Sequence, residues 1–543
     1  MTSLTLFPFN FFTAYCLLLL LLTSCAQMQI PTGGPKDVAP PRAIAYLPDS
    51  AATNFISKTI RITFDEFVTL KDVQGNLVIS PPLEKQPEVK LVKNKILEIE
   101  FKEQLKANTT YSMNFGNAIA DIHEGKIAEG FSYIFSTGNY IDTIALTGTV
   151  QDAFTQGQEK NAVVMLYSMN EDSLPYKRMP DYFAKTGSDG SYSIRHIKPG
   201  KYKVFALQDA NRNFLFDSEE EKIGFSDTMV DLTRNRKLNM KVFSEEKRRQ
   251  FVKKAVSIEP GIALVVFNCP LNQHTIGFIK EGPAVSDFNR NYGLDSTWIF
   301  HYDTEQDSIH LEFFSMQGMR RDTVQIRLPK GQKMQLRPKI TFSGSGGTQD
   351  LDKGIKLEFN FPIHHLDIKG ILYSGKDGVP IPLDSTWFGV PNGTRKLFLK
   401  RPASKQWKED QEYSVIILPG SFIGKAGLVS DTIKIKFKTP ELKYYGSLKL
   451  EVKPGKGNFV YQLLDEKGGI VVTSAMKGDQ QFNYTLLSPG KYRVRLVEDN
   501  NVNGRWDTGN YLKKQQPEKV LYSPGTYNVR SDWDVEEVWK VNN

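Results

Sequence analysis

The sequence predicts an all-β protein built from tandem β-sandwich domains. Short runs in which apolar and polar residues alternate, such as residues 61–64 and 202–205, recur along the chain and are separated by Gly, Pro, Asn and Asp. Alternation with a period of two is typical of strands that bury one face, and frequent turn residues keep such strands short. The chain has 543 residues, which is enough for several domains. No amphipathic helix is expected beyond a helical turn or two within residues 244–255.

The N-terminal segment predicts a lipid anchor. Residues 16–22 read CLLLLLL, an apolar core of signal-peptide length that is too short to span a bilayer. Residues 22–25, Leu-Thr-Ser-Cys, resemble the lipobox of bacterial lipoproteins, although no Lys or Arg precedes the apolar run. The resemblance implies that residues 1–24 are a removed signal peptide and that lipidated Cys25 attaches the protein to the outer membrane. An ordinary secretory signal with an incidental cysteine is the alternative.

Residues 25–39 are rich in Pro and Gly and predict a tether that lifts the first domain off the membrane. Ala26 follows the cysteine and no acidic cluster comes directly after it, which favours the periplasmic face over the cell surface. The other cysteines are Cys16, in the signal, and Cys269, alone in the apolar run VVFNCPL. We therefore expect Cys269 to be a buried core thiol and the mature protein to have no intramolecular disulfide.

Three segments of the chain repeat one strand pattern. The runs ITFDEFV, VVFNCPL and LEFNFPI each reach Phe, then Asp or Asn, and then return to apolar residues. GMRRDTVQIRL matches GLVSDTIKIKF, and FSTG matches FKTP. These matches predict three copies of one sandwich domain, which we call module 1 (40–140), module 3 (255–335, degenerate) and module 4 (336–440).

Module 1 resembles the bacterial Ig-like domain family of surface and cell-envelope proteins. The residues that carry the resemblance are Phe64 and Asp65 in a strand, the Asn-Thr-Thr-Tyr run at 108–111, Asp121 before the Gly125 turn, and the closing Phe-Ser-Thr at 135–137. The whole layout is similar to Ig-like-domain lipoproteins of Bacteroidota-type bacteria. These motifs are structural rather than catalytic.

A second type of module occurs twice. Residues 187–213 align with residues 480–504 at a shared Pro-Gly-Lys-Tyr, and the surrounding pattern resembles the transthyretin-like, carboxypeptidase-regulatory-like β-sandwich. In that fold Pro-Gly makes the turn and the following strand enters the core. We call these segments module 2 (141–245) and module 5 (441–543). The order of the five modules is explained by duplication of a pair, an Ig-like module followed by a transthyretin-like module. One additional Ig-like module lies between the two copies of the pair.

Two polar loops, DANRNFLFDSEE and DNNVNGRWDTGN, place oxygen-bearing side chains at positions 1, 3, 5 and 9, which bind Ca²⁺ in EF-hand loops. The candidate ligands are Asp209, Asn211, Asn213, Asp217 and, at position 12, Glu220 in module 2, and Asp499, Asn501, Asn503 and Asp507 in module 5. At position 6, where the turn favours glycine, module 5 has Gly504 and module 2 has Phe214. The sequence thus predicts weak, structural Ca²⁺ binding; a hydrated Asn/Asp turn is the alternative.

Composition and motifs limit the classes of function that the protein can have. The net charge of +8 is mild for this length, and no basic stripe with interleaved aromatics is present, so nucleic acid is not an expected partner. No G-x-S-x-G, H-E-x-x-H or P-loop motif occurs, which argues against an enzyme. We expect a structural or interaction module, or an accessory subunit of an envelope complex, with a protein partner in the cell envelope. Glycan binding at exposed aromatics such as Trp298, Trp387 or Trp506 is the alternative.

Overall fold

The computed structural model describes residues 38–541 except 129, 247–250, 270–274, 282–285, 291–295, 303–306, 316–320, 330, 376–377, 390–393 and 400–406. The predicted signal peptide, the lipidated Cys25 and most of the tether lie outside the described residues. Within them the chain consists of strands that form pairs of packed sheets, which confirms the predicted all-β class of tandem β-sandwiches. None of the described helices has the length and hydropathy needed to cross a membrane.

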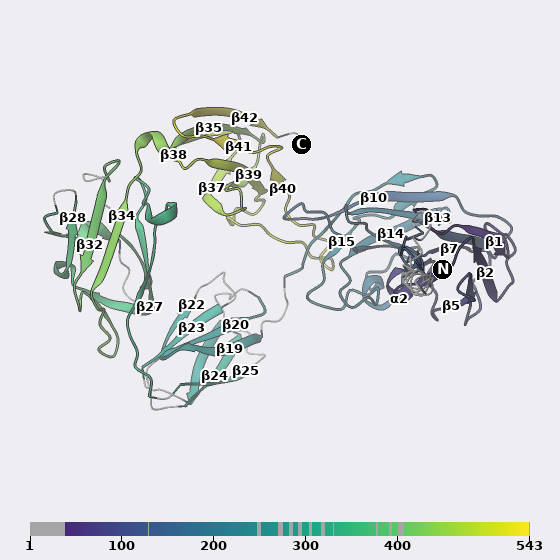
Figure 1. Cartoon of the computed structure of the whole chain (residues 1–543), viewed down its shortest axis with the longest axis horizontal. Helices are drawn as coiled ribbons and strands as arrows, with labels where there is room; N and C mark the ends of the chain where they lie inside the picture. The colour runs from purple at the N-terminus through teal and green to yellow at the C-terminus, as the bar shows by residue number, and fades with distance from the viewer. Residues whose placement is uncertain are drawn as a thin grey trace, which may run out of the picture.

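Module 1 is a sandwich around one core (Figure 1). Its sheets have the orders β1-β2-β6-β5, β3-β8 and β4-β7-β9. The elements are β1 (Ala43–Leu47), β2 (Thr59–Phe64), β3 (Val68–Leu70), α2 (Val73–Asn76), β4 (Val78–Ser80), β5 (Glu88–Val92), β6 (Ile96–Glu100), β7 (Thr110–Asn114), β8 (Ile119–Asp121) and β9 (Ser132–Ser136). Ile60, Ile62 and Phe64 alternate along β2 and are fully buried, as the sequence pattern predicts.

Modules 2 and 5 share one strand order. Module 2 contains β10 (Ile144–Asp152), β11 (Val163–Tyr167), α3 (Leu174–Lys177), β12 (Tyr182–Lys185), β13 (Ser191–Ile197), β14 (Gly200–Leu207), β15 (Ile223–Phe225), β16 (Val230–Leu232), β17 (Arg236–Lys237) and β18 (Met240–Val242). Module 5 contains η5 (Leu442–Tyr444), β35 (Gly446–Lys453), β36 (Asn458–Leu464), β37 (Ile470–Lys477), β38 (Gln480–Leu487), β39 (Gly490–Glu498), β40 (Val520–Tyr522), β41 (Tyr527–Val529) and β42 (Asp534–Lys540). In each, a sheet β13-β10-β17 or β38-β35-β42 faces a sheet β12-β11-β14-β15 or β37-β36-β39-β40.

The shared Pro-Gly-Lys-Tyr has the same physical role in both modules. Its glycine begins strand β14 or β39, and its tyrosine, Tyr202 or Tyr492, is buried. The Tyr202 hydroxyl donates to the Lys198 carbonyl at 2.8 Å, and the Tyr492 hydroxyl donates to the Ser488 carbonyl at 2.7 Å. The tyrosine therefore enters the core and closes the turn that precedes its own strand.

Modules 3 and 4 follow as two further sandwiches. Module 3 contains β19 (Val252–Glu259), β20 (Ile262–Phe267), β21 (Thr275–Glu281), β22 (Ser286–Arg290), β23 (Ser296–His301), β24 (Ser308–Ser315) and β25 (Arg321–Arg327). Module 4 contains β26 (Pro338–Thr341), η1 (Ser345–Gly347), β27 (Ile355–Leu366), η2 (Ile368–Gly370), β28 (Ile371–Ser374), β29 (Ile381–Pro382), η3 (Ser385–Trp387), β30 (Phe388–Gly389), β31 (Thr394–Leu399), β32 (Glu412–Ile417), β33 (Phe422–Gly424) and β34 (Ile433–Lys438). Module 3 has a core of its own, and its residues Ile262 and Phe300 also join the core of module 4, where the Phe300 ring lies 5.9 Å from the Phe361 ring.

Two local expectations differ from the structure. Of the segment 244–255, where a helical turn or two was expected, residues 252–255 are strand, because β19 begins at Val252 and pairs with β20, and residues 247–250 lie outside the described part of the chain. Cys269 is partly exposed rather than fully buried, since it lies after the last residue of β20 and not within that strand.

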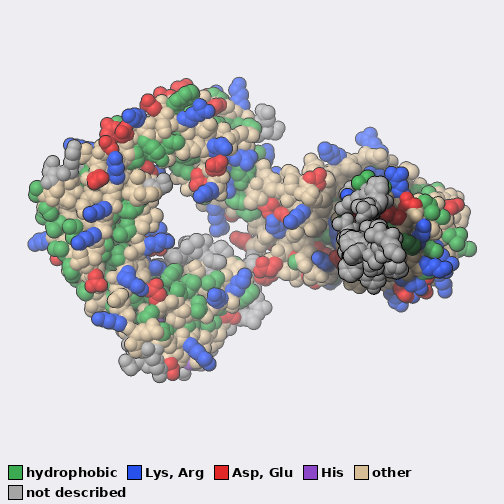
Figure 2. All heavy atoms as spheres, viewed as in Figure 1, with side chains coloured by type: hydrophobic (Ala, Val, Ile, Leu, Met, Phe, Trp, Pro, Cys, Tyr) green, Lys and Arg blue, Asp and Glu red, His purple; other side chains and the backbone are tan. Residues whose placement is uncertain are grey.

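The five modules form a closed arrangement (Figure 1). Modules 1 and 2 lie together, and modules 3, 4 and 5 form an arc that leads from module 2 and returns to it. An opening remains between modules 2, 3, 4 and 5 in the space-filling view (Figure 2). The chain therefore forms a ring, and the contact that closes it joins module 5 to module 2.

Candidate functional site

The Asp/Asn loop of module 2 is a tight turn in which the predicted side chains come together. The Asp209 carboxylate accepts hydrogen bonds from the backbone amides of Asn213 at 3.2 Å and Phe214 at 2.9 Å. The side-chain amides of Asn211 and Asn213 donate to Asp217 at 2.9 and 2.6 Å. Four of the predicted positions therefore surround one turn.

The loop of module 5 repeats this geometry. Asp499 is 4% exposed and accepts from the backbone amides of Asn503 at 3.0 Å and Gly504 at 2.8 Å. The amides of Asn501 and Asn503 donate to Asp507 at 2.5 and 2.7 Å. Gly504 has φ +77°, a left-handed conformation that glycine adopts without strain.

Two carboxylates that sequence reasoning missed complete the loops. Glu221 is 1% exposed and accepts from the backbone amides of Ala210 and Asp217, whereas the predicted Glu220 is exposed. Burial raises the pKa of the Glu221 carboxyl, while its backbone hydrogen bonds lower it. In module 5 the corresponding residue is Glu518, which accepts from Asn500 at 2.9 Å and Asp507 at 3.0 Å. The shared Glu-Lys before strands β15 and β40 was the available signal.

The second loop is longer than the first, and the additional residues have a function of their own. Glu221 follows Asp217 by four positions, whereas Glu518 follows Asp507 by eleven, so module 5 carries seven additional residues. These residues lie in the segment 506–516, which we call the docking arm. The arm packs on the outer face of sheet β12-β11-β14-β15 of module 2, in a hydrophobic cluster separate from the core between the two sheets.

Tyr511 is the centre of the docking arm. Its side chain is 0% exposed and belongs to a hydrophobic cluster whose other fully buried members all come from module 2. Its ring lies 5.1 Å from Phe205 and 5.2 Å from Phe225, both in edge-to-face geometry. Trp506, at the start of the arm, packs 4.9 Å from Phe154 of module 2. Aromatic pairs of this kind stabilise a contact beyond the area they bury.

Hydrogen bonds surround the buried ring of Tyr511. Three residues of the arm donate to module 2: the Thr508 hydroxyl to the Ser244 carbonyl at 2.6 Å, the Tyr511 amide to Glu245 Oε1 at 2.5 Å, and Gln516 Nε2 to Asp227 Oδ1 at 2.7 Å and to the Phe225 carbonyl at 3.1 Å. Beside the arm, Gln156 Nε2 of module 2 donates to the Val520 carbonyl, and the Tyr522 hydroxyl donates to the Phe154 carbonyl at 3.3 Å. Gly509 allows this approach, because a Cβ there would lie 2.5 Å from the Phe243 ring. The contact therefore combines a buried aromatic anchor with a polar rim.

One carboxylate joins both modules electrostatically. Asp172 pairs with Lys203 of module 2 at 2.9 Å and with Lys514 of the docking arm. Hydrogen bonds from Lys514 and Lys203 lower the pKa of the Asp172 carboxyl from its ordinary value of 3.8 to about 2. Because the folded-state pKa is depressed, this contribution to stability is present above about pH 4 and is lost as the pH falls towards 2.

Replacing Asp172 with asparagine is expected to weaken ring closure modestly. Asp172 is more than half exposed, so the effect should be of the size of surface ion pairs, about 0.2–1 kcal/mol, and should fall in 1 M NaCl. A double-mutant cycle with Lys514→Gln, followed by thermal unfolding at low and high salt, measures the coupling energy between Asp172 and Lys514. A coupling energy that is zero at low salt would contradict the assignment.

The three tryptophans considered for glycan binding are engaged in packing. Trp387 is 3% exposed in the core of module 4. The Arg395 guanidinium lies 4.1 Å from the Trp298 ring, which is half-buried. Trp506 contacts module 2 and donates its indole N–H to the Glu518 carbonyl at 2.9 Å. No group of three or more His, Cys, Asp or Glu residues with metal-binding geometry occurs among the described residues.

Comparison with known proteins places the N-terminal module in a family. Residues 37–137 match the bacterial Ig-like domain. No curated protein sequence matches the chain. Solved structures with similarity include the major pilin subunit BcpA of Bacillus cereus (10% identity, TM-score 0.14, covering 73% of this chain and 99% of that one), domains 1–6 of the surface layer protein SbsC (10%, 0.14, 86% and 66%) and titin domains A168–A170 (9%, 0.14, 52% and 99%). The chain is thus an all-β protein of tandem β-sandwich domains, and its first domain is similar to the bacterial Ig-like domain.

Proposed function

We propose that the protein is a non-enzymatic lipoprotein of the outer membrane that serves as a closed structural frame, either as an interaction module or as an accessory subunit of an envelope complex. The observation that carries this proposal is the burial of Tyr511 of module 5 in the hydrophobic cluster on the outer face of sheet β12-β11-β14-β15 of module 2. A chain of independently linked sandwiches would sample many arrangements. Closing the ring removes this freedom in advance, so a partner that contacts several modules loses less entropy on binding.

Co-purification from detergent-solubilised membranes tests the frame. We expect the tagged wild-type protein and the control Tyr140→Ala, whose side chain is 49% exposed in module 1, to recover the same envelope protein in stoichiometric amounts. Tyr511→Ala should recover much less of it, because the arm no longer holds module 5 on module 2. Equal recovery by all three would contradict a role for the closed ring. Reproducible hydrolysis of a polysaccharide or peptide by the purified protein would contradict the non-enzymatic assignment.

The anchor is proposed at Cys25, with the protein on the periplasmic face. The support is the Leu-Thr-Ser-Cys sequence at 22–25, and several acyl chains, each contributing about 0.8 kcal/mol per buried CH₂, give stable attachment. Cys25→Ser is expected to move the protein from the outer-membrane fraction to the soluble fraction, measured by immunoblot after a high-salt wash. Cys269→Ser is the control and should stay with the membrane. A Cys25→Ser protein that still sediments with outer membranes would disprove the anchor.

We further propose that both Asp/Asn loops bind Ca²⁺ weakly and structurally. Carboxylate and amide oxygens are the ligands Ca²⁺ prefers, and Asp499, Asn501, Asn503 and Asp507 converge on one turn. Glu518 adds a carboxylate beside them. An ion held there would neutralise these charges and stabilise the base from which the docking arm extends.

A further inference from the structure

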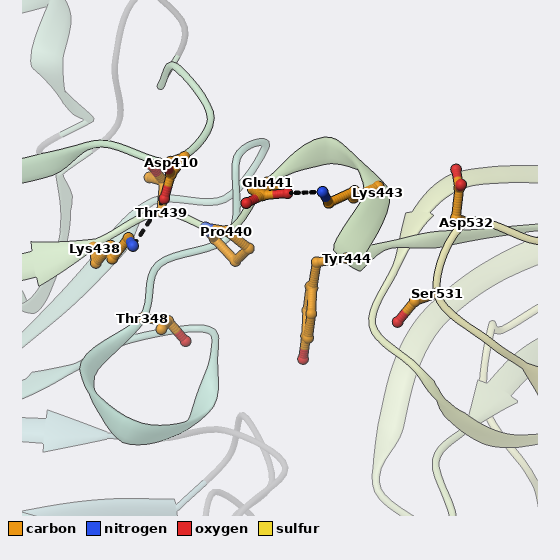
Figure 3. A pocket seen from close by; sticks show the side chains of 10 residues that line it. All are labelled: Thr348, Asp410, Lys438, Thr439, Pro440, Glu441, Lys443, Tyr444, Ser531 and Asp532. Carbon is orange, nitrogen blue, oxygen red and sulfur yellow. Dashed lines mark ion pairs between the residues drawn. The ribbon is translucent and has the colours of Figure 1, made fainter.

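A cleft lies at the junction of modules 4 and 5 (Figure 3). Its volume is about 650 Å³, within the range of roughly 300–1,000 Å³ that is typical of ligand pockets. Lys438 is the last residue of β34, and Glu441 comes from the connection that follows. Thr348 comes from the loop after η1, and Ser531 from the loop before β42. The Tyr444 side chain extends from η5 into the space between Thr348 and Ser531 (Figure 3).

The walls of this cleft are held in place by the neighbouring Tyr445. Its hydroxyl donates to the buried Asp350 at 3.1 Å and accepts from the Leu351 amide at 3.3 Å, both in module 4. Its carbonyl accepts from the Asp532 amide of module 5 at 2.8 Å. One side chain and its backbone thus tie both modules together, so the cleft is preformed rather than a product of loose linkage.

The equivalent junction of modules 1 and 2 provides an internal comparison. The connection from Thr137 to Leu146 has the same length as the connection from Thr439 to Leu448. The Thr137 hydroxyl donates to the Lys106 carbonyl, and the Thr439 hydroxyl donates to the Lys408 carbonyl, each at 2.6 Å. In the first pair the residue at the position of Tyr444 is Asp142. It is 5% exposed and accepts from the buried Thr110 hydroxyl at 2.9 Å. At the junction of modules 1 and 2 this position of the connection is therefore buried. At the junction of modules 4 and 5 the same position places an aromatic ring in an open cleft.

The chemistry of the cleft favours a neutral, hydroxyl-rich ligand. Tyr444 is 40% exposed and contacts Tyr445 edge-on at 5.2 Å, so much of its ring remains accessible. Four of the charged groups form two ion pairs, Asp410 with Lys438 at 2.8 Å and Glu441 with Lys443 at 2.7 Å, and Asp532 adds one further carboxylate to the lining. Such pairs offer donors and acceptors side by side without a strong net field, which suits sugar hydroxyls because each both donates and accepts.

We propose that this cleft binds a neutral oligosaccharide segment and that Tyr444 is the platform on which one sugar ring stacks. The weakly positive C–H groups on one face of a sugar ring pack against the negative face of an aromatic ring. The hydroxyls of Thr348 and Ser531 and the two ion pairs then contact the sugar hydroxyls. This site is separate from the docking arm and from the three tryptophans considered first.

Titration of the full-length mature protein with cellohexaose, maltohexaose and chitohexaose tests the proposal, with saturation-transfer NMR to detect contact and calorimetry to measure affinity. We expect millimolar or tighter binding of at least one of the three. Tyr444→Ala should weaken it about tenfold, which is the loss expected for one stacking contact. Tyr444→Phe retains the ring and should bind nearly as well as the wild type. Tyr140→Ala removes an exposed tyrosine from the equivalent connection of the first pair and should bind as the wild type does.

Three outcomes would overturn the proposal. The first is that none of the three hexasaccharides contacts the wild-type protein at 10 mM. The second is binding that survives Tyr444→Ala unchanged. The third is a proline-rich decapeptide that binds in place of the sugars and is lost in Tyr444→Ala, which would assign the cleft to a peptide. Thermal melting of each variant shows whether its fold is retained, because Tyr444 is too exposed for its removal to unfold module 5.

Discussion

Replacement of Tyr511 with alanine is expected to open the ring. The side chain is completely buried in module 2, and truncation of a buried aromatic costs about 3–5 kcal/mol because it loses burial and leaves a cavity. Every 1.4 kcal/mol is a factor of ten, so the closing equilibrium should shift towards the open form by at least about a hundredfold. Small-angle X-ray scattering of the full-length protein should show a larger radius of gyration.

Matched variants separate docking from general destabilisation. Tyr511→Phe keeps the ring and its edge-to-face contacts with Phe205 and Phe225, so it should leave the ring of modules closed. Gly509→Ala should open it as Tyr511→Ala does, because the added Cβ would lie 2.5 Å from Phe243. Gly525→Ala is the neutral control, since a Cβ there meets no atom within 4 Å. If Tyr511→Ala gives the same scattering curve as Tyr511→Phe, the arm does not hold the ring closed.

Calcium is expected to raise the melting temperature of the transition that includes module 5. Extracellular modules bind Ca²⁺ with dissociation constants of about 10⁻⁴–10⁻³ M, so 20 mM CaCl₂ should stabilise the folded module by about 2–3 kcal/mol. For a unit of about 100 residues this corresponds to roughly 10 °C or more. The measurement is calorimetric melting of the full-length protein in CaCl₂, in MgCl₂ at equal concentration, and with chelator.

Asp499→Ala provides the control for the calcium experiment. The variant also loses hydrogen bonds to Asn503 and Gly504, so its melting temperature should fall in every buffer. The informative quantity is the difference between calcium and chelator, which should shrink in the variant. Equal melting temperatures of the wild type in calcium, magnesium and chelator would return both loops to the status of hydrated turns.

Sequence reasoning reached the fold class and the local turns, because both depend on patterns over a few residues. The alternation in β2 and the Pro-Gly-Lys-Tyr turns are of this kind, and so is the convergence of Asp499, Asn503 and Asp507. Glu518 was missed because seven additional residues separate it from the position that the first loop suggests.

The docking arm and the cleft could not be predicted from the sequence, for a different reason. Tyr511 lies in the polar run GNYLKKQQP, whose local pattern is typical of an exposed loop. Its burial depends on Phe205 and Phe225, which are nearly 300 positions away in the sequence. No pattern over a few neighbouring residues predicts such a contact. Likewise, whether Tyr444 is exposed depends on how two modules meet, not on the residues beside it.

The ring also has a consequence for the order in which the chain folds. Tyr511 contacts Glu245 across 266 positions, so module 2 is complete long before the residue that fills its aromatic pocket has been made. Until module 5 has followed modules 3 and 4 along the chain, that pocket stays open. During this interval Phe205, Phe225 and Phe243 lack one buried neighbour, and the incomplete protein exposes an apolar surface that the finished one does not. The dependence of this protein on chaperones should therefore be greatest before module 5 docks on module 2.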